Sequence, residues 1–180
     1  MLNVNDYDIL RNHQCSLQET SKDTSKEKVQ YMTTCTKKVV DFDAVKTEFL
    51  NSLNETEECA KSVDAFVIDD YNYFIEFKNG DASREGHEII NKAKDSMLIM
   101  NCILKRQINK SRLSDIFILV YNENKVTINS KDLRAGALAK KANKRYALFG
   151  LENIKGFCFK DVQTLTKDMF EEEIAKALDW

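Results

Sequence analysis

Residues 62–80 read SVDAFVIDDYNYFIEFKNG, and this stretch decides the fold. β-branched and aromatic side chains fill most of Val63–Ile68 and Tyr73–Phe77, as is typical of strands. Turn-forming aspartate and asparagine residues separate the two runs, and Asn79-Gly80 ends the second one. Two strand-like runs joined by a short polar turn predict a β-hairpin.

Helical patterns lie on both sides of this hairpin. Before it, Asp41 or Asp43 is expected to cap a helix that runs through Asn54. After it, Ser83 is expected to cap a long helix that runs to Arg106. The apolar residues of each helix recur on one face, which is typical of a helix that packs against a sheet. They are Val45, Phe49, Leu50 and Leu53 in the first helix, and Ile89, Ile90, Ala93, Met97, Met100 and Leu104 in the second.

The remaining segments continue the alternation of helices and strands. The run DIFILVY at Asp115–Tyr121 is apolar after its first residue, which predicts a strand covered on both faces. Residues 18–38 are polar and predict a loop or weakly ordered connection. The predicted fold class is therefore α/β (α+β), a three-layer domain with a central mixed β-sheet flanked by helices. The other expected elements are a short helix near Asp6–Asn12, a helix through Leu133–Lys144, a strand near Gly156–Val162 and a C-terminal helix over Lys167–Leu178.

Composition limits the domain organisation and the location of the chain. With 180 residues, 43% of them hydrophobic, a single domain over 1–180 is expected, with the N-terminal helix and polar segment in 1–40 and the core in 41–180. The 27 basic and 29 acidic side chains give a net charge of −2, unlike a protein that only coats nucleic acid. Five cysteines without a CxxC pair, and two histidines, argue against structural zinc and favour a reduced, cytoplasmic chain. No membrane span and no signal peptide are expected.

Three charged side chains stand at one end of the predicted hairpin. Glu76 and Lys78 share a face because side chains alternate along a strand. A turn with an odd number of residues places Asp64 opposite Glu76, where Cβ atoms lie about 4.5–5.5 Å apart. Two carboxylates, a backbone carbonyl and waters suit Mg²⁺ (or Mn²⁺). A neighbouring ammonium can help a metal-bound water to attack and can offset charge in the transition state.

Asp64, an eleven-residue gap and then Glu76-Phe77-Lys78, on a strand that leads into a helix, resemble the PD-(D/E)XK nuclease superfamily. The resemblance covers roughly Phe49–Tyr121 and implies a restriction-endonuclease-like fold. It implies that Asp64 and Glu76 bind the metal ion and that the carbonyl of Phe77 is a further ligand. It also implies that Lys78 serves the attacking water.

The resemblance extends to the helices on either side of the hairpin. It implies that Glu48, on the preceding helix, assists in metal binding. It also implies that Lys92 or Ser96, on the following helix, contacts the substrate. The chain departs from the family pattern in two places: position 63 is valine where the motif has proline, and no extra strand is visible between the first helix and Asp64.

Two groups of basic residues stand outside this motif. Each is either a solvated helix face or a surface that contacts the phosphate backbone, and Lys140, Lys141 and Arg145 are the candidates for substrate contact. Tyr146 and Phe149, next to the second group, either belong to the core or stack on a base. The groups are Lys105, Arg106, Lys110 and Arg112, and then Arg134, Lys140, Lys141, Lys144 and Arg145.

These observations predict a metal-dependent nuclease that hydrolyses phosphodiester bonds with a metal-activated water. The substrate is a nucleic acid, with DNA and RNA both left open, and a second copy of the chain or another protein is an open partner. One alternative is a catalytically inactive nuclease-like scaffold that acts as an immunity, inhibitor or complex subunit. The other is that Glu76 and Lys78 form an ordinary solvent-facing pattern on the sheet.

Overall fold

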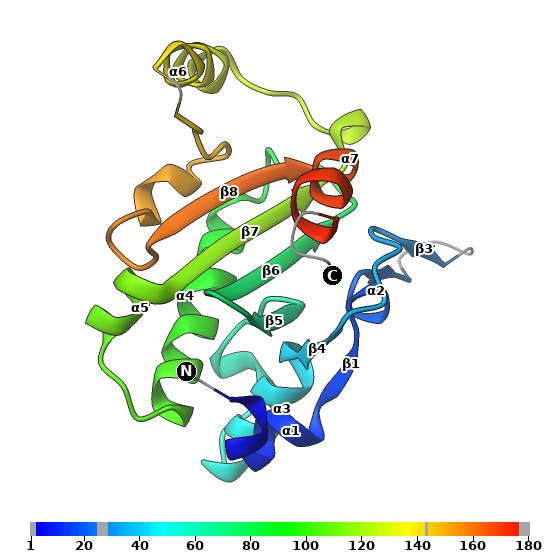
Figure 1. Cartoon of the computed structure of the whole chain (residues 1–180), viewed down its shortest axis with the longest axis vertical. Coiled ribbons are helices and arrows are strands. Elements are labelled where there is room, and N and C mark those ends of the chain that lie inside the picture. The colour runs from blue at the N-terminus through cyan, green and yellow to red at the C-terminus, as the bar shows by residue number, and fades with distance from the viewer. Residues whose placement is uncertain (1–2, 25–28, 143, 177–180) are drawn as a thin grey trace.

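A computed structural model describes residues 3–24, 29–142 and 144–176. Six strands form one mixed sheet in the order β1-β4-β5-β6-β7-β8 (Figure 1). Neighbouring strands are antiparallel from β1 to β6, and β6, β7 and β8 are parallel. The strands are β1 (Gln14–Ser16), β4 (Lys38–Asp41), β5 (Ala65–Ile68), β6 (Asn72–Lys78), β7 (Asp115–Tyr121) and β8 (Asp161–Thr166); β2 (Lys22–Asp23) and β3 (Gln30–Tyr31) pair separately.

Helices cover both faces of this sheet, as the predicted three-layer arrangement requires. In Figure 1, α4 lies behind the sheet, α7 lies in front of it, and α6 projects from the top of the molecule. The helices are α1 (Asp8–Asn12), α2 (Leu17–Thr20), α3 (Phe42–Ser52), α4 (Gly86–Ile103), α5 (Ile108–Ser114), α6 (Ser130–Lys141) and α7 (Lys167–Phe170), which continues as a π-helical turn (Glu171–Ala175). Short 3₁₀ turns lie at Val4–Asp6, Glu57–Cys59, Glu123–Lys125 and Leu151–Ile154.

The predicted hairpin is confirmed as β5 and β6, with Ala65 opposite Ile75. Strand β6 is the centre of the core because its alternate side chains enter two different apolar layers. Phe74 packs in the layer under α3 and α4, with its ring centroid 4.9 Å from that of Phe66. Ile75 and Phe77 pack in the layer under α7. The predicted strand Asp115–Tyr121 is also confirmed, and all of its residues are buried.

The region before the hairpin differs from its predicted form. Residues 18–38 were expected to be a loop, but their described part contains most of α2, the β2–β3 pair and the first residue of β4. The buried side chains of Leu17, Met32 and Cys35 anchor this region to the sheet. These apolar residues are too widely spaced to form a periodic pattern, so the sequence did not reveal their role.

The ends of helices α3 and α4 also differ from those predicted. Asp41 caps α3 as expected, with its carboxylate 3.1 Å from the Ala44 amide, but Leu53 lies beyond the helix and is 55% exposed. Ser83 does not cap α4; it bonds to Asp81 in a turn, and the helix begins at Gly86.

The last strand and helices are shifted as well. Strand β8 begins at Asp161, five residues later than expected, and the helix expected through Lys144 ends at Lys141. The expected end of the last helix, Leu178, lies outside the described residues. Within the described residues, no helix is long and apolar enough to cross a membrane.

A buried polar network joins the starts of β6 and β7 to α4 and α5. The carboxylate of Asp115, which is fully buried, forms an ion pair with Arg106 and accepts a 2.7 Å hydrogen bond from the Asn72 amide. Arg106 also donates a 2.6 Å bond to Asn101, which accepts another from Ser111. Because each charge has several partners, the network fixes this end of the sheet.

We expect Asp115→Ala to lower the free energy of unfolding by about 3–5 kcal/mol, because it leaves the Arg106 charge buried without its partner. Urea unfolding followed by circular dichroism measures this. Asp8→Ala, which breaks an exposed ion pair with Arg11, is the control and should cost less than about 1 kcal/mol. Equal losses in the two variants would contradict the role assigned to the network.

Candidate functional site

The structure brings Asp64 and Glu76 together at one end of the hairpin. Asp64 is the residue before β5, and its amide donates a 3.1 Å bond to the carbonyl of Ile75. Strand alternation turns Glu76 toward α4, away from the face that carries Ile75 and Phe77. The charge of Asp64 acts directly on the carboxyl of Glu76, as expected for neighbours on one face.

The backbone of Phe77 contacts Asp64. Its amide donates a 2.6 Å hydrogen bond to Oδ2 of Asp64. In an extended strand the amide and carbonyl of one residue point to the same side, so the carbonyl of Phe77 also faces the edge where Asp64 lies. The resemblance to the nuclease superfamily implies a backbone ligand at this residue.

The carboxylate of Glu76 lies between the sheet and α4. Only 2% of its side chain is exposed, and Lys92 on α4 places its ammonium 2.7 Å from Oε1. The other oxygen, Oε2, is buried and has no hydrogen-bond partner among the described residues. A buried carboxylate oxygen without a donor is costly, so this atom is available for a cation.

Burial shapes the protonation of both acids. It raises the pKa of Asp64 to about 7, against the opposing effects of the Lys92 charge and the Phe77 amide. Burial also raises the pKa of Glu76 well above its ordinary value, and the charge of Asp64 raises it further. A buried acid and a partly buried acid side by side therefore favour binding a proton or a metal ion over remaining as two unneutralised charges.

Lys78 lies next to Asp64 and Glu76 but forms its ion pair with a different residue. Its ammonium forms an ion pair with Glu85, just before α4. Lys78 and Asp64 both line a pocket of about 240 Å³, together with Lys22 and Asp23 of β2. The pocket gives a ligand access to Asp64 and Lys78 from the side of the β2–β3 pair. Glu85 was not among the predicted site residues, because its contact with Lys78 depends on how the chain turns after β6.

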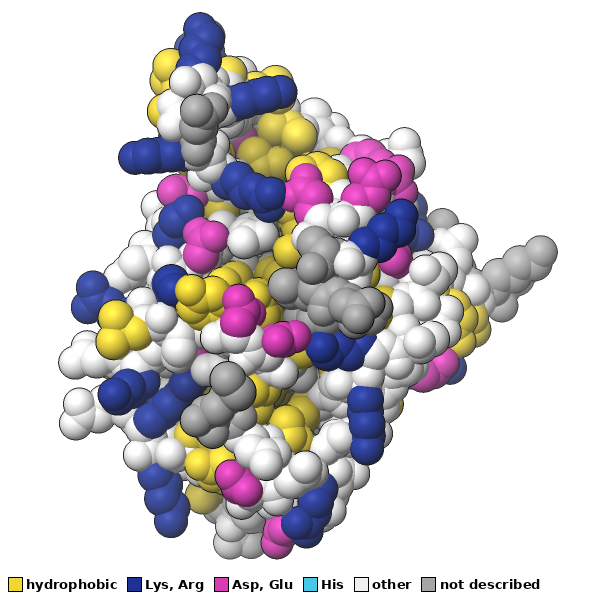
Figure 2. Space-filling view, viewed as in Figure 1, with side chains coloured by type: hydrophobic (Ala, Val, Ile, Leu, Met, Phe, Trp, Pro, Cys, Tyr) yellow, Lys and Arg dark blue, Asp and Glu magenta, His cyan; other side chains and the backbone are white. Residues whose placement is uncertain are grey.

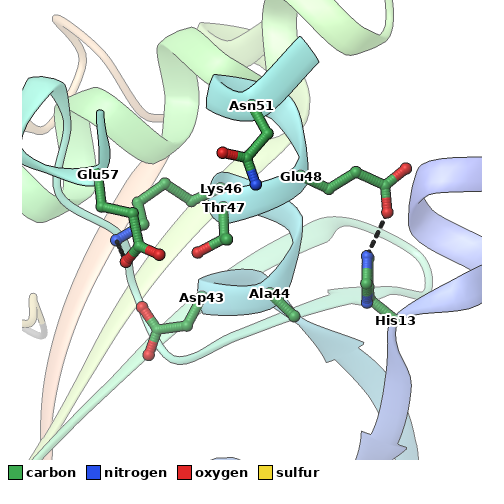
Figure 3. Close-up of a pocket in the computed structure, with 8 residues that line it drawn as sticks. All are labelled: His13, Asp43, Ala44, Lys46, Thr47, Glu48, Asn51 and Glu57. Atoms are coloured by element: carbon green, nitrogen blue, oxygen red, sulfur yellow. Dashed lines mark hydrogen bonds and ion pairs between the residues drawn. The ribbon is translucent and has the colours of Figure 1, made fainter. Parts of the chain in front are cut away.

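Glu48 does not join the pair, contrary to the expectation from the resemblance. Figure 3 shows it reaching from α3 to His13, whose Nε2 lies 2.5 Å from Oε2 of Glu48. Asp43, one turn earlier, lies on a different side of α3, bonds to Ser62 and raises the pKa of both Asp64 and Glu76. The sequence offered Asp43 only as a helix cap, since helical phase alone did not show which acid faces the strands.

The two candidates on the next helix have different roles. Ser96 is fully buried and accepts a 2.9 Å hydrogen bond from the amide of Val63, so it fixes α4 to the segment just before β5 and is not open to substrate. Lys92 is open on one side, where it lines a pocket of about 430 Å³ with Asp43 and Glu88.

The chemistry of the donors fits a small divalent cation in part. Carboxylate oxygens from Asp64 and Glu76, one of them without a partner, and a carbonyl at Phe77 are the hard oxygen ligands that Mg²⁺ prefers. Within the part of the chain that the structure describes, no three His, Cys, Asp or Glu side chains are close enough to hold a metal. A divalent ion would therefore rest on two carboxylates and keep several waters.

The members of the two basic groups lie in different environments in the fold. Arg106 is taken up by the buried network, and Arg112 bonds to the carbonyl of Gly156. Phe149 is buried with its ring centroid 5.2 Å from that of Tyr121, so it belongs to the core. Arg145 forms an ion pair with Glu173.

Helix α6 keeps its basic residues exposed. Figure 2 shows Lys and Arg side chains spreading from the projecting helix at the top of the molecule, with apolar side chains between them. The apolar residues include Leu133 and Leu138, which are 57% and 68% exposed. The exposed basic residues of this helix are Lys131, Arg134, Lys140 and Lys141.

No family model matches this chain, and no curated protein or solved structure is similar enough to count as a match. The functional argument therefore rests on the geometry of the site.

We expect Asp64→Asn to stabilise the protein in chelator at pH 8. Below about pH 4 Asp64 is protonated in both the folded and unfolded states, so the variant gains nothing there. As the pH rises toward 7, the unfolded chain releases this proton while the folded chain retains it, and wild-type stability falls. The gain of the variant should therefore grow from pH 4 to pH 7 and then level off.

Thermal unfolding across this pH range measures the gain. Asp6→Asn, at an exposed position far from the site in the sequence, is the control. A loss of stability in Asp64→Asn at pH 8 would mean that the charged carboxylate is net stabilising where it lies.

Proposed function

We propose that this protein is a metal-dependent phosphodiesterase that cleaves nucleic acid at the Asp64–Glu76–Lys78 site. The observation that carries the proposal is the buried, unpartnered Oε2 of Glu76 next to a second, partly buried acid, Asp64. A sheet interior holds such a pair at a cost, and binding a cation offsets that cost.

The order of elements supports a restriction-endonuclease-like architecture. Helix α3 precedes the hairpin β5–β6, helix α4 follows it, and β7 then pairs parallel to β6. The family pattern has a further strand between the first helix and Asp64, and the described residues 53–64 contain no strand. Strand β4, which comes before α3, lies beside β5 instead. The antiparallel part of the sheet is thus built in a different chain order.

Each residue of the site has a role in the proposed reaction. A bound Mg²⁺ or Mn²⁺ lowers the pKa of a water and polarises the phosphate. Asp64 and Glu76 hold the ion, and the Phe77 carbonyl faces the same edge. Lys78, held by Glu85 at the rim of the 240 Å³ pocket, orients the water or offsets the charge that develops on the phosphate.

Helix α6 supplies the contact with a polyanion in this proposal. Its exposed Lys140 and Lys141 carry no ion pair among the described residues. Helix α6 projects from the rest of the molecule. Its lysines can therefore contact phosphates on either side of the cleaved bond.

The proposal is tested by incubating the protein with single- and double-stranded DNA and RNA. We expect cleavage of at least one substrate in Mg²⁺ or Mn²⁺ and none in chelator. Glu76→Gln should abolish both cleavage and metal binding. Lys78→Ala should remove most of the rate, by about 10²-fold or more, and spare metal binding by calorimetry. Lys94→Ala, at an exposed position of α4, is the control and should cleave normally.

Binding without cleavage in either metal would favour the inactive-scaffold alternative. Absence of both binding and cleavage would refute the proposal and direct the search to a protein partner, by affinity capture.

We expect the double variant Lys140→Glu and Lys141→Glu to weaken nucleic-acid binding and to reduce its salt dependence, because counterion release scales with the number of phosphate contacts. Fluorescence anisotropy over a range of salt concentrations measures both. Lys105→Glu with Lys110→Glu, in the other basic group, is the charge-matched control. Equal weakening by the two pairs would indicate a general effect of net charge.

A further inference from the structure

The ammonium of Lys92 lies against the carboxylate of Glu76, one of the two proposed metal ligands. It lies 2.7 Å from Oε1 of a carboxylate that is 2% exposed. The other lysine near the site, Lys78, forms its ion pair with Glu85. Among the described residues, Lys92 is therefore the one cation that forms an ion pair with Glu76.

The surroundings of Lys92 are strongly acidic. Besides Glu76, with which it forms an ion pair, the charges of Asp64 and Asp43 act on its ammonium. The ammonium therefore lies next to the two carboxylates that would bind a metal. It neutralises only part of their charge, since Oε2 of Glu76 still lacks a partner.

A pocket lies beside the side chain of Lys92. A quarter of this side chain is exposed, and it borders the 430 Å³ pocket. Two acids of this pocket already have partners, since Glu57 pairs with Lys46 and Glu88 pairs with Lys61. The acids of the lining still outnumber these two lysines, because Asp43 and Glu58 line the pocket as well. The pocket therefore offers a second acidic environment next to the Lys92 side chain.

We propose that Lys92 is a displaceable internal cation, which fills the Asp64–Glu76 site until a divalent metal ion replaces it and drives the ammonium into the neighbouring pocket. This inference rests on the proposed metal site. It means that the metal competes with a tethered charge, which weakens the affinity for the metal and keeps the acid pair stable without it.

The test is to measure Mg²⁺ and Mn²⁺ binding to Lys92→Met by calorimetry, because methionine keeps much of the volume and removes the charge. The variant should bind at least about tenfold more tightly than wild type, since no positive charge opposes the ion at short range. In chelator it should melt at a lower temperature than wild type, and metal should raise its melting temperature more. If the variant folds only when Mn²⁺ is present, that result also supports the inference.

Two further variants separate this role from a structural one. Lys92→Arg keeps a cation, so it should bind metal no more tightly than wild type. Lys46→Met removes a lysine that lines the same pocket but pairs with Glu57, and it should leave metal affinity unchanged. Unchanged or weaker affinity in Lys92→Met would overturn the inference, because Lys92 would then merely position Glu76.

The outcome also distinguishes this inference from the proposed function. If wild type binds metal and cleaves, and Lys92→Met binds no more tightly, the inference fails and the function stands. If wild type binds metal without cleaving any substrate, and Lys92→Met binds metal more tightly, the inference stands and the nuclease function fails. If neither protein binds Mg²⁺ or Mn²⁺, both are refuted.

Discussion

The burial of the Glu76 carboxylate in the middle of the molecule is the constraint on which the site depends. Strand β6 lies between two apolar layers, and its neighbours Phe74, Ile75 and Phe77 all enter them. A charged group at this position is stable only if the fold brings a cation to it. Lys92 on α4 does so, and the closeness of Asp64 makes the need for positive charge greater.

The same constraint explains how the elements around the site are fixed. Helix α4 is tied to the segment just before β5 by the hydrogen bond between Ser96 and Val63, so Lys92 lies at a set depth above Glu76. At the other end of β6, the Asp115–Arg106 network fixes the start of the strand. The hairpin is thus held at one end by a structural ion pair with several partners, and it presents at the other an acid pair that is only partly neutralised. The polar groups around Asp115 all have partners, whereas Oε2 of Glu76 has none among the described residues. This difference is the reason to look for a functional site at the Glu76 end of β6.

Much of the fold was predictable because the signals are local. The hairpin and the strand Asp115–Tyr121 were confirmed, since β-branched and aromatic runs interrupted by turn residues have few other solutions. The strand-rich segment before α3 was missed because its anchors, Leu17, Met32 and Cys35, have no period. Helix starts were misplaced where a turn competed, as at Ser83, which bonds to Asp81.

The sequence by itself placed Asp64 and Glu76 side by side on condition that the hairpin turn has an odd number of residues, because side chains alternate along each strand. The structure met that condition, since Ile68 pairs with Asn72 and residues 69–71 form the turn. The sequence also determined that Lys78 shares a face with Glu76. Only the tertiary structure decided which cation meets each acid: Lys92 reaches Glu76 from a helix 16 residues away, and Lys78 turns to Glu85. It likewise directed Glu48 to His13, because the rotation of a helix about its axis is set by packing and not by spacing along the chain.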